Sequence, residues 1–332
     1  MMLTPAYKLT IGNKVINTTD KPQASTVVEL VVTLDMDTPA DSFLLVMGQV
    51  GGVKPKRDDV VKLELGYSDN GGLTQVMVAT VVTVEPNLTT TRVVGYSGAS
   101  AILRTYVEKT YEGNTAGAIV RDLASQAKVD VATADDGITF PAYVIDGRRG
   151  VYHHMLDLAT LSGFDLYVNA DGKLVFEQFS NGKTVHIFEY AKHIVGLDVV
   201  QTPPYAGMVQ AWGESPGSGH GETAWAWLTK DFSSSKGAAG SGAILLLESS
   251  ALRTALAAST AASAALTTIQ RRTVRGQLRA LGQPEIMLGD AIQLKGLPDD
   301  TLNKNFQVRS ITHRITKLGG FTTDIGFRAI QV

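Results

Sequence analysis

Hydrophobic and polar residues alternate with a period of two in the first third of the chain. The alternation runs through Thr26–Met36, Val60–Tyr67 and Thr74–Val84, and a Gly-containing turn at 69–72 separates the last two segments. Strand, turn and strand at this spacing predict a β-hairpin. In the first segment the alternation places four apolar residues on one face: Val28, Leu30, Val32 and Leu34. We therefore expect residues 1–108 to form a first β domain.

The spacing of apolar residues changes to a helical one at about residue 110. Asn114–Val129 has an apolar face at helical spacing, with Asn114 or Thr115 as the N-cap, and Val151–Ser162 repeats the pattern before Gly163. A hairpin with an Asp-Gly turn at 171–172 follows. These elements predict a small inserted α/β module over 109–194, with two helices and a hairpin.

Strand patterns return at about residue 195. An Ala-rich segment, 249–269, predicts a long helix, and alternating strands close the chain. In the last strand one face holds Phe321, Thr323, Ile325 and Phe327, as in a half-buried antiparallel sheet. We expect a second β domain over 195–332 with 249–269 as a flanking helix. The fold class is mainly β with α (α+β), and no internal repeat is visible in the sequence.

Composition narrows the possible chemistry. The chain has 332 residues, of which 44% are hydrophobic and 19% are charged, a formal net charge of −2 and no cysteine. Two or three domains with real cores are therefore possible. The charge gives no overall attraction to nucleic acid or to anionic lipid. Disulfides, thiolate nucleophiles and Cys-ligated zinc are excluded.

Candidate catalytic motifs are weak. The nearest match to the serine-hydrolase motif G-x-S-x-G, residues 95–99 around Ser97, lacks the final Gly and is interpreted as the end of a strand. Adjacent Asp pairs at 58–59, 135–136 and 299–300 indicate solvated turns. A long-range pair of glycosidase carboxylates stays open. We predict no catalytic, cofactor-binding or metal-ligating residues, and no cofactor.

The histidines do not have the spacing of metal ligands. His153 and His154 project about 100° apart on a helix, so they cannot grip one ion as an i, i+4 pair could. We interpret them as part of a solvated helix face, His220 as a loop residue and His313 as a polar side chain packed in a strand.

For two further groups of side chains, the sequence allows either a packing or solvent-exposed role or a role in binding. All three tryptophans lie between 212 and 227, and Trp225 and Trp227 share one face of a strand. Packing in the sheet or a subunit interface is favoured over carbohydrate binding. The second group lies opposite Val274 and Leu278 and forms either an exposed face or a lumen or inter-subunit surface: Arg272, Arg275 and Arg279.

Two stretches resemble the baseplate hub proteins of tailed phages and contractile injection systems. One is the end of the chain, Arg271–Leu281 followed by GQPEIMLGDAIQLKGL and FQVRSITHRITKLGGFTTDIGF. The other combines TAGAIVRDLA at 115–124 with MLDLATLSGFDLYVNADGKLVF at 155–176. Both are similar to the late control protein D family and to the spike-base half of VgrG.

The resemblance implies a structural protein rather than an enzyme. Such a hub is a homotrimer in which each subunit supplies two tube-like β domains, giving a pseudo-six-fold ring that joins the tail tube hexamer to a separate trimeric spike. Neighbouring baseplate proteins are further expected partners, and neither stable nucleic-acid binding nor membrane insertion is expected. The expected location is the baseplate of a virion tail or injection particle assembled in the bacterial cytoplasm. The alternative is a cell-wall-degrading or carbohydrate-binding accessory of the tail tip. For the isolated chain we also expect partial disorder of 213–242.

Overall fold

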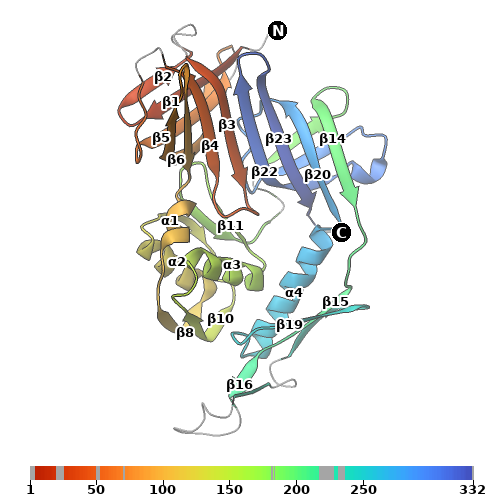
Figure 1. The fold of residues 1–332 in the computed structure, drawn as a ribbon. Coiled ribbons are helices and arrows are strands. Elements are labelled where there is room, and N and C mark those ends of the chain that lie inside the picture. Colours follow the sequence, from red (N-terminus) through yellow and green to blue (C-terminus); the bar gives the residue numbers. More distant parts are fainter. Residues whose placement is uncertain are drawn as a thin grey trace.

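The computed structural model describes residues 4–19, 26–49, 53–69, 72–180, 182, 184–216, 228–230 and 236–330. Strands dominate these residues, and the helices gather on one side of a large sheet (Figure 1). The prediction of a mainly β fold with α is confirmed.

The first β region supplies seven strands within the described residues. They are β1 (Pro5–Ile11), β2 (Lys14–Asn17), β3 (Val27–Asp35), β4 (Ser42–Gly48), β5 (Val60–Tyr67), β6 (Gly72–Pro86) and β7 (Thr90–Tyr96). Alternation buries one face along most of these strands, and the sequence-based prediction fails at one residue of β3. The register of β3 against β4 shifts between Val27 and Glu29, so Val28 bulges outward and is exposed, contrary to the sequence-based prediction. Val27 is buried instead.

The last part of the chain supplies a second group of strands. They are β13 (Val185–Glu189), β14 (Ile194–Gln201), β20 (Val274–Leu281), β21 (Ala291–Lys295), β22 (Asn305–Thr316) and β23 (Gly320–Ala329), with a 3-10 turn at Asp300–Leu302. The predicted face of β23 is confirmed, because Phe321, Thr323, Ile325 and Phe327 are all buried. Strand β13 lies in the range expected for the inserted module, yet it pairs with β21.

The two groups have the same strand order. We call β1, β3, β4, β5, β6 and β7 the N-terminal unit, and β13, β14, β20, β21, β22 and β23 the C-terminal unit. Numbered along the chain, the strands of each unit are arranged second, third, sixth, fifth, fourth, first. The one difference in direction is at the end of this order, where β1 is antiparallel to β5 but β13 is parallel to β21. The structure thus contains a repeat that the sequence does not reveal.

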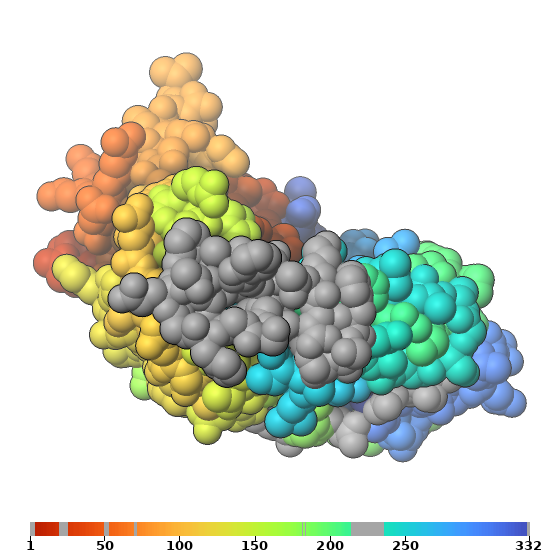
Figure 2. Space-filling view, turned by 90° about the horizontal axis from the view of Figure 1, so that it is seen from below, coloured from red at the N-terminus to blue at the C-terminus, as the bar shows by residue number. Residues whose placement is uncertain are grey.

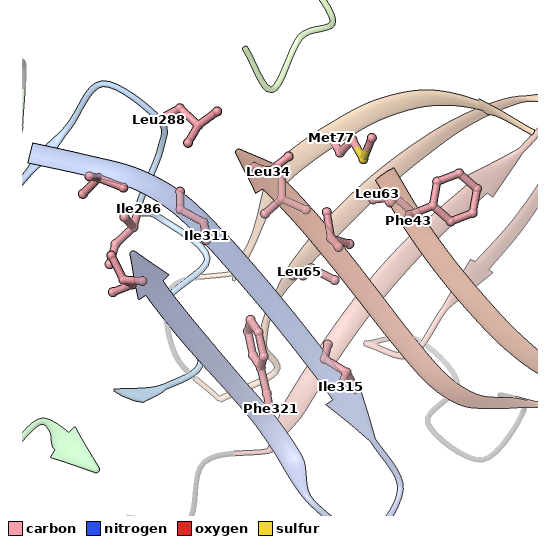
Figure 3. Packing of buried hydrophobic residues seen from close by; sticks show 14 of the residues in the cluster. Leu34, Phe43, Leu63, Leu65, Met77, Ile286, Leu288, Ile311, Ile315 and Phe321 are labelled. Carbon is pink, nitrogen blue, oxygen red and sulfur yellow. The ribbon is translucent and has the colours of Figure 1, made fainter. Parts of the chain in front are cut away.

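One seam joins the units into a single sheet. Strand β22 pairs antiparallel with β3, from Ser310 opposite Asp35 to Thr316 opposite Glu29. The buried side chains of both units form one hydrophobic cluster, in which Leu34 and Phe43 lie in the same core as Ile311 and Phe321 (Figure 3).

A middle module follows β7. Its elements are α1 (Ala99–Arg104), β8 (Lys109–Thr115), α2 (Ala116–Gln126), β9 (Val131–Ala134), β10 (Thr139–Ile145), α3 (Val151–Ser162), β11 (Asp165–Val168) and β12 (Leu174–Glu177). The predicted caps are confirmed: the Thr115 side chain accepts a hydrogen bond from the Ala118 N–H, and Gly163 ends α3 in the left-handed region. The predicted hairpin is β11–β12.

A second insertion separates β14 from β20. It contains β15 (Met208–Trp212), β16 (Glu214–Pro216), β17 (Leu228–Lys230), β18 (Gly237–Gly240), β19 (Ile244–Glu248) and α4 (Ala255–Arg271). Helix α4 begins six residues later than predicted, where the Thr254 side chain caps it. Small residues let it pack closely, since a Cβ at Gly237 would lie 2.1 Å from the Ser259 nitrogen. Figure 2 shows this side of the molecule, with the middle module in yellow and the strands β18 and β19 of this insertion in cyan.

Candidate functional site

The seam between the units is fully buried at its centre. His313 of β22 lies opposite Val32 of β3, and neither side chain is exposed. The His313 Nδ1 is 3.0 Å from the Thr323 hydroxyl, and its ring packs edge-on against Phe321. Burial lowers the pKa of His313 to about 3, so the ring is neutral at physiological pH. The predicted packing role of His313 is confirmed.

An ionic cluster, buried except at Asp37, connects the seam to the middle module. Arg309 of β22 donates to Asp165 of β11 at 2.5 Å and to Asp37, beyond the end of β3, at the same distance. Arg328 donates to Asp165 at 3.3 Å, and the Gln307 amide donates to the other Asp165 oxygen at 2.5 Å. One carboxylate therefore holds three side chains of the C-terminal unit, which fixes the module against the sheet.

Positive charge exceeds negative charge around this cluster. A cleft of about 340 Å³ between α3, α4 and the sheet is lined by Arg271, Arg272, Arg309 and Arg328, but by only two acidic residues, Asp37 and Asp165. Burial, with the neighbouring Arg309 guanidinium, lowers the pKa of Arg328 to about 10. Arg328 therefore stays charged at neutral pH, and removing Asp165 would leave the buried Arg309 and Arg328 with Asp37 as the only carboxylate of the cleft.

The prediction of a solvated face for both helix histidines is wrong for one of them. His153 is exposed, but His154 is only 2% exposed. The His154 Nε2 is 3.1 Å from the Asp146 carbonyl oxygen, and its Nδ1 is 3.4 Å from an Arg149 nitrogen. The apolar face of α3 is wider than the sequence spacing indicated, so His154 falls inside it. Because both ring nitrogens contact chain atoms, His154 has a structural role.

The other candidate residues are not brought together into a catalytic arrangement. Ser97 lies directly after β7 as predicted, and its side chain is buried. Asp135, Asp136 and Asp299 are exposed, and Asp299 caps the 3-10 turn. Among the described residues, no group of three or more His, Asp or Glu side chains has the geometry to hold a metal ion. Within the same residues, no helix is long and apolar enough to cross a membrane.

Of the three arginines predicted to line one face of a strand, two do so: Arg275 and Arg279. Arg275 and Arg279 lie on the exposed face of β20, opposite the buried Val274 and Leu278. Arg279 pairs with Asp324 of β23 at 2.7 Å. Arg272 precedes the strand, as the C-cap of α4. Trp225, Trp227, His220 and most of 213–242 lie outside the described residues.

Two apolar side chains project from corresponding hairpin tips. Leu88 lies in the turn between β6 and β7, and Leu318 in the turn between β22 and β23. They are 94% and 103% exposed, more than any other large hydrophobic residue described. Strand β7 runs from its tip to α1, and β23 runs from its tip toward the end of α4, where Arg271 donates to the Ile330 carbonyl. Both tips therefore lie at the ends of their strands that point away from the helices (Figure 1).

Solved structures share this arrangement over the whole chain. The 43 kDa tail protein of prophage MuSo2 from Shewanella oneidensis superposes with a TM-score of 0.73 at 13% identity, covering 98% of each chain. A tail protein from Neisseria meningitidis MC58 gives a TM-score of 0.70 at 13% identity, covering 98% of this chain and 96% of that one. The chain has the fold of phage tail proteins.

The same fold extends to secretion machinery. The E. coli c3393 protein, described as a component of the type VI secretion system with structural similarity to the T4 tail proteins gp27 and gp5, gives a TM-score of 0.62. Its identity is 9%, over 96% of this chain and 76% of that one. The predicted resemblance to tail hub proteins is thereby confirmed at the level of the tail-protein fold. No family profile and no curated protein sequence matches the chain.

Proposed function

We propose that this protein is a structural hub of a phage tail or a contractile injection system. Its role is to form a homotrimeric ring between the tail tube and the central spike. The observation that carries the proposal is the strand order shared by the N-terminal and C-terminal units. Three copies of a chain with two like units present six like units around one axis, so a three-fold assembly acquires a six-fold surface.

The hairpin tips supply a surface for the six-fold side. Leu88 and Leu318 give each protomer two exposed apolar side chains at corresponding positions. A trimer presents six of them, and exposed apolar groups of this kind favour protein contacts. We assign this surface to the tail tube hexamer, and the opposite, helix-bearing side to the trimeric spike and to neighbouring baseplate proteins. The 43 kDa and Neisseria proteins with this fold are named as tail proteins, which supports a place for this chain in a tail.

The proposed role requires no catalysis. His154 and His313 serve packing, the buried Ser97 ends a strand, and the ionic cluster is satisfied largely within the chain. We accordingly propose a non-enzymatic protein located in the tail baseplate of the particle after assembly in the bacterial cytoplasm.

The native mass of the purified protein tests this function. We expect a trimer by light scattering, either alone or on mixing with a candidate trimeric spike protein, and rings with six density lobes by electron microscopy. A monomer under both conditions, together with lysis of peptidoglycan in a gel assay, would overturn the proposal in favour of a cell-wall hydrolase.

A further inference from the structure

The two units differ in how their second strands are covered. In the N-terminal unit, β3 has β4 on one side and β22 on the other. In the C-terminal unit, the corresponding strand β14 pairs with β20 alone among the described residues. One edge of β14 therefore offers unpaired backbone N–H and C=O groups, which is the usual template for strand addition.

The strands β3 and β14 correspond in detail. Each has a register shift at its second residue, which leaves Val28 bulged in β3 and Val195 bulged in β14. Both valines are exposed. Aligning the two bulges places Leu197 and Val199 of β14 on Leu30 and Val32 of β3.

The burial of these positions shows what β14 lacks. Leu30 and Val32 are 0% exposed, since β22 covers the open side of β3. Leu197 and Val199 pack against the same core but are only half-buried, and Val195 and Val200 are 63% and 47% exposed. A strand paired with the open edge of β14 would therefore bury Leu197 and Val199 as β22 buries Leu30 and Val32. The described part of the protomer does not supply such a strand.

The matching surface is on β6. Strand β22 is the fifth strand of its unit, and β21 covers only its first residues, so β3 pairs with the remainder. Strand β6 is the fifth strand of the N-terminal unit, and β5 covers it as far as Thr80. Val81 then exchanges backbone hydrogen bonds with Asp58 and Asp59. Val82 then bulges out of the pairing with β7, and residues 83–86 pair with β7 but with no second strand in the described part of the chain.

We propose that β14 of one protomer pairs antiparallel with residues 83–86 of β6 in a second copy of the chain, repeating the β3–β22 seam. Two such edges per chain, one on each unit, close a ring of three chains with six like seams. Aligning the bulge of β14 with that of β3, and the bulge of β6 at Val82 with that of β22 at Arg309, places Gln201 opposite Val84 and Val200 opposite Glu85. This inference rests on the proposed trimer and specifies how its subunits join.

Cysteine cross-linking tests the pairing directly, because the chain has no cysteine of its own. Two double variants place thiols across the proposed seam, Q201C with V84C and V200C with E85C. Oxidation of a purified sample at high protein concentration should give a covalent trimer on a denaturing gel in at least one of them. The matched control is V31C with R314C, whose residues already face each other within one chain and should give a monomer band.

A charge on the open edge provides a second test. The V195E/V200E variant should raise the protomer concentration needed for half-assembly at least tenfold, because V200E places a second carboxylate directly opposite Glu85. The control V144E changes a similarly exposed valine of β10, outside both seams, and should leave assembly unchanged.

These experiments distinguish failure of the proposed seam from failure of the proposed trimeric hub. A native trimer that neither thiol pair cross-links, and that V195E/V200E does not weaken, would overturn the seam and leave the trimeric hub intact. A protein that stays monomeric at all concentrations and with the spike protein, without cross-linked species, would overturn both.

Discussion

Arg309 and Asp165 form an ion pair at 2.5 Å although they lie 144 residues apart in the chain. Arg309 belongs to the strand that joins the two β units, and Asp165 opens the first strand of the hairpin after α3. Both side chains are buried, so water screens the pair little. This contact makes the position of the middle module depend on the seam between the units.

Removing the Asp165 carboxylate should therefore destabilise the protein strongly. D165A leaves Arg309 and Arg328 without their shared counter-charge, and breaking a buried pair in this way costs about 3–5 kcal/mol. The control D324A removes the partner of the largely exposed Arg279 and should cost less than about 1 kcal/mol. Urea denaturation of both variants measures the difference. Equal losses would show that Asp165 does not hold the cluster.

Asp41 should make the protein more stable as the pH falls. Burial raises the pKa of Asp41 to about 7 from 3.8 in the unfolded chain, although its carboxylate accepts the Asp35 N–H. A raised carboxyl pKa stabilises the fold fully below pH 3.8, and this contribution is lost as the pH rises to about 7. D41N should remove that dependence and stabilise the protein at pH 8 by a few kcal/mol, at about 1.4 kcal/mol per pKa unit. Denaturation midpoints at pH 4 and pH 8 test this.

The control for Asp41 is D135N, a change at an exposed carboxylate outside the sheet, which should leave the difference between the two midpoints as in the unmodified protein. If D41N also leaves that difference unchanged, Asp41 is not the responsible group.

His313 should act in the opposite direction. Burial lowers its pKa to about 3 from 6.5, so its contribution to stability is present above pH 6.5 and is lost as the pH falls toward 3. H313N is less stable at neutral pH because it leaves space in the core, but it should lose less stability between pH 6.5 and pH 4 than the unmodified protein. Denaturation curves at the two pH values give the comparison. Parallel losses in both proteins would mean that His313 is not protonated on unfolding.

The two tip leucines should matter for assembly and not for folding. L88D/L318D changes side chains that are almost completely exposed, so the melting temperature should shift little. If the tips contact the tube, polymerisation of tube protein on the hub should fall at least tenfold in a nucleation assay. L256D alters an exposed leucine of α4, away from the tips, and serves as the control. Full nucleation by L88D/L318D would place the tube contact elsewhere.

Local elements could be predicted from the sequence because their determinants are local. Helices α2 and α3, the Thr115 and Gly163 caps and the Asp-Gly hairpin all follow from side-chain spacing and from the conformational freedom of Gly. The alternation in β23 likewise identified its buried face.

Long-range features could not be predicted in this way. A period-two pattern fixes the face of a strand but not its neighbour, so it could not show that β13 pairs with β21 or that both units share one strand order. The cluster around Asp165 joins residues more than a hundred positions apart, and no motif marks them. The burial of His154 also depended on what packs over α3.

The seam between β3 and β22 can form only late in synthesis, because its two strands lie near opposite ends of the chain. Asp37, just past the end of β3, and its partner Arg309 are 272 residues apart. At about 5–20 residues per second, a ribosome needs roughly 15 to 55 s to make the intervening chain. Until β22 has been synthesised, one edge of β3 has unpaired backbone N–H and C=O groups. Strands of nascent chains on neighbouring ribosomes can pair with this edge. High-level expression should therefore favour swapped or aggregated chains, and slower translation should raise the yield of correctly closed protomers.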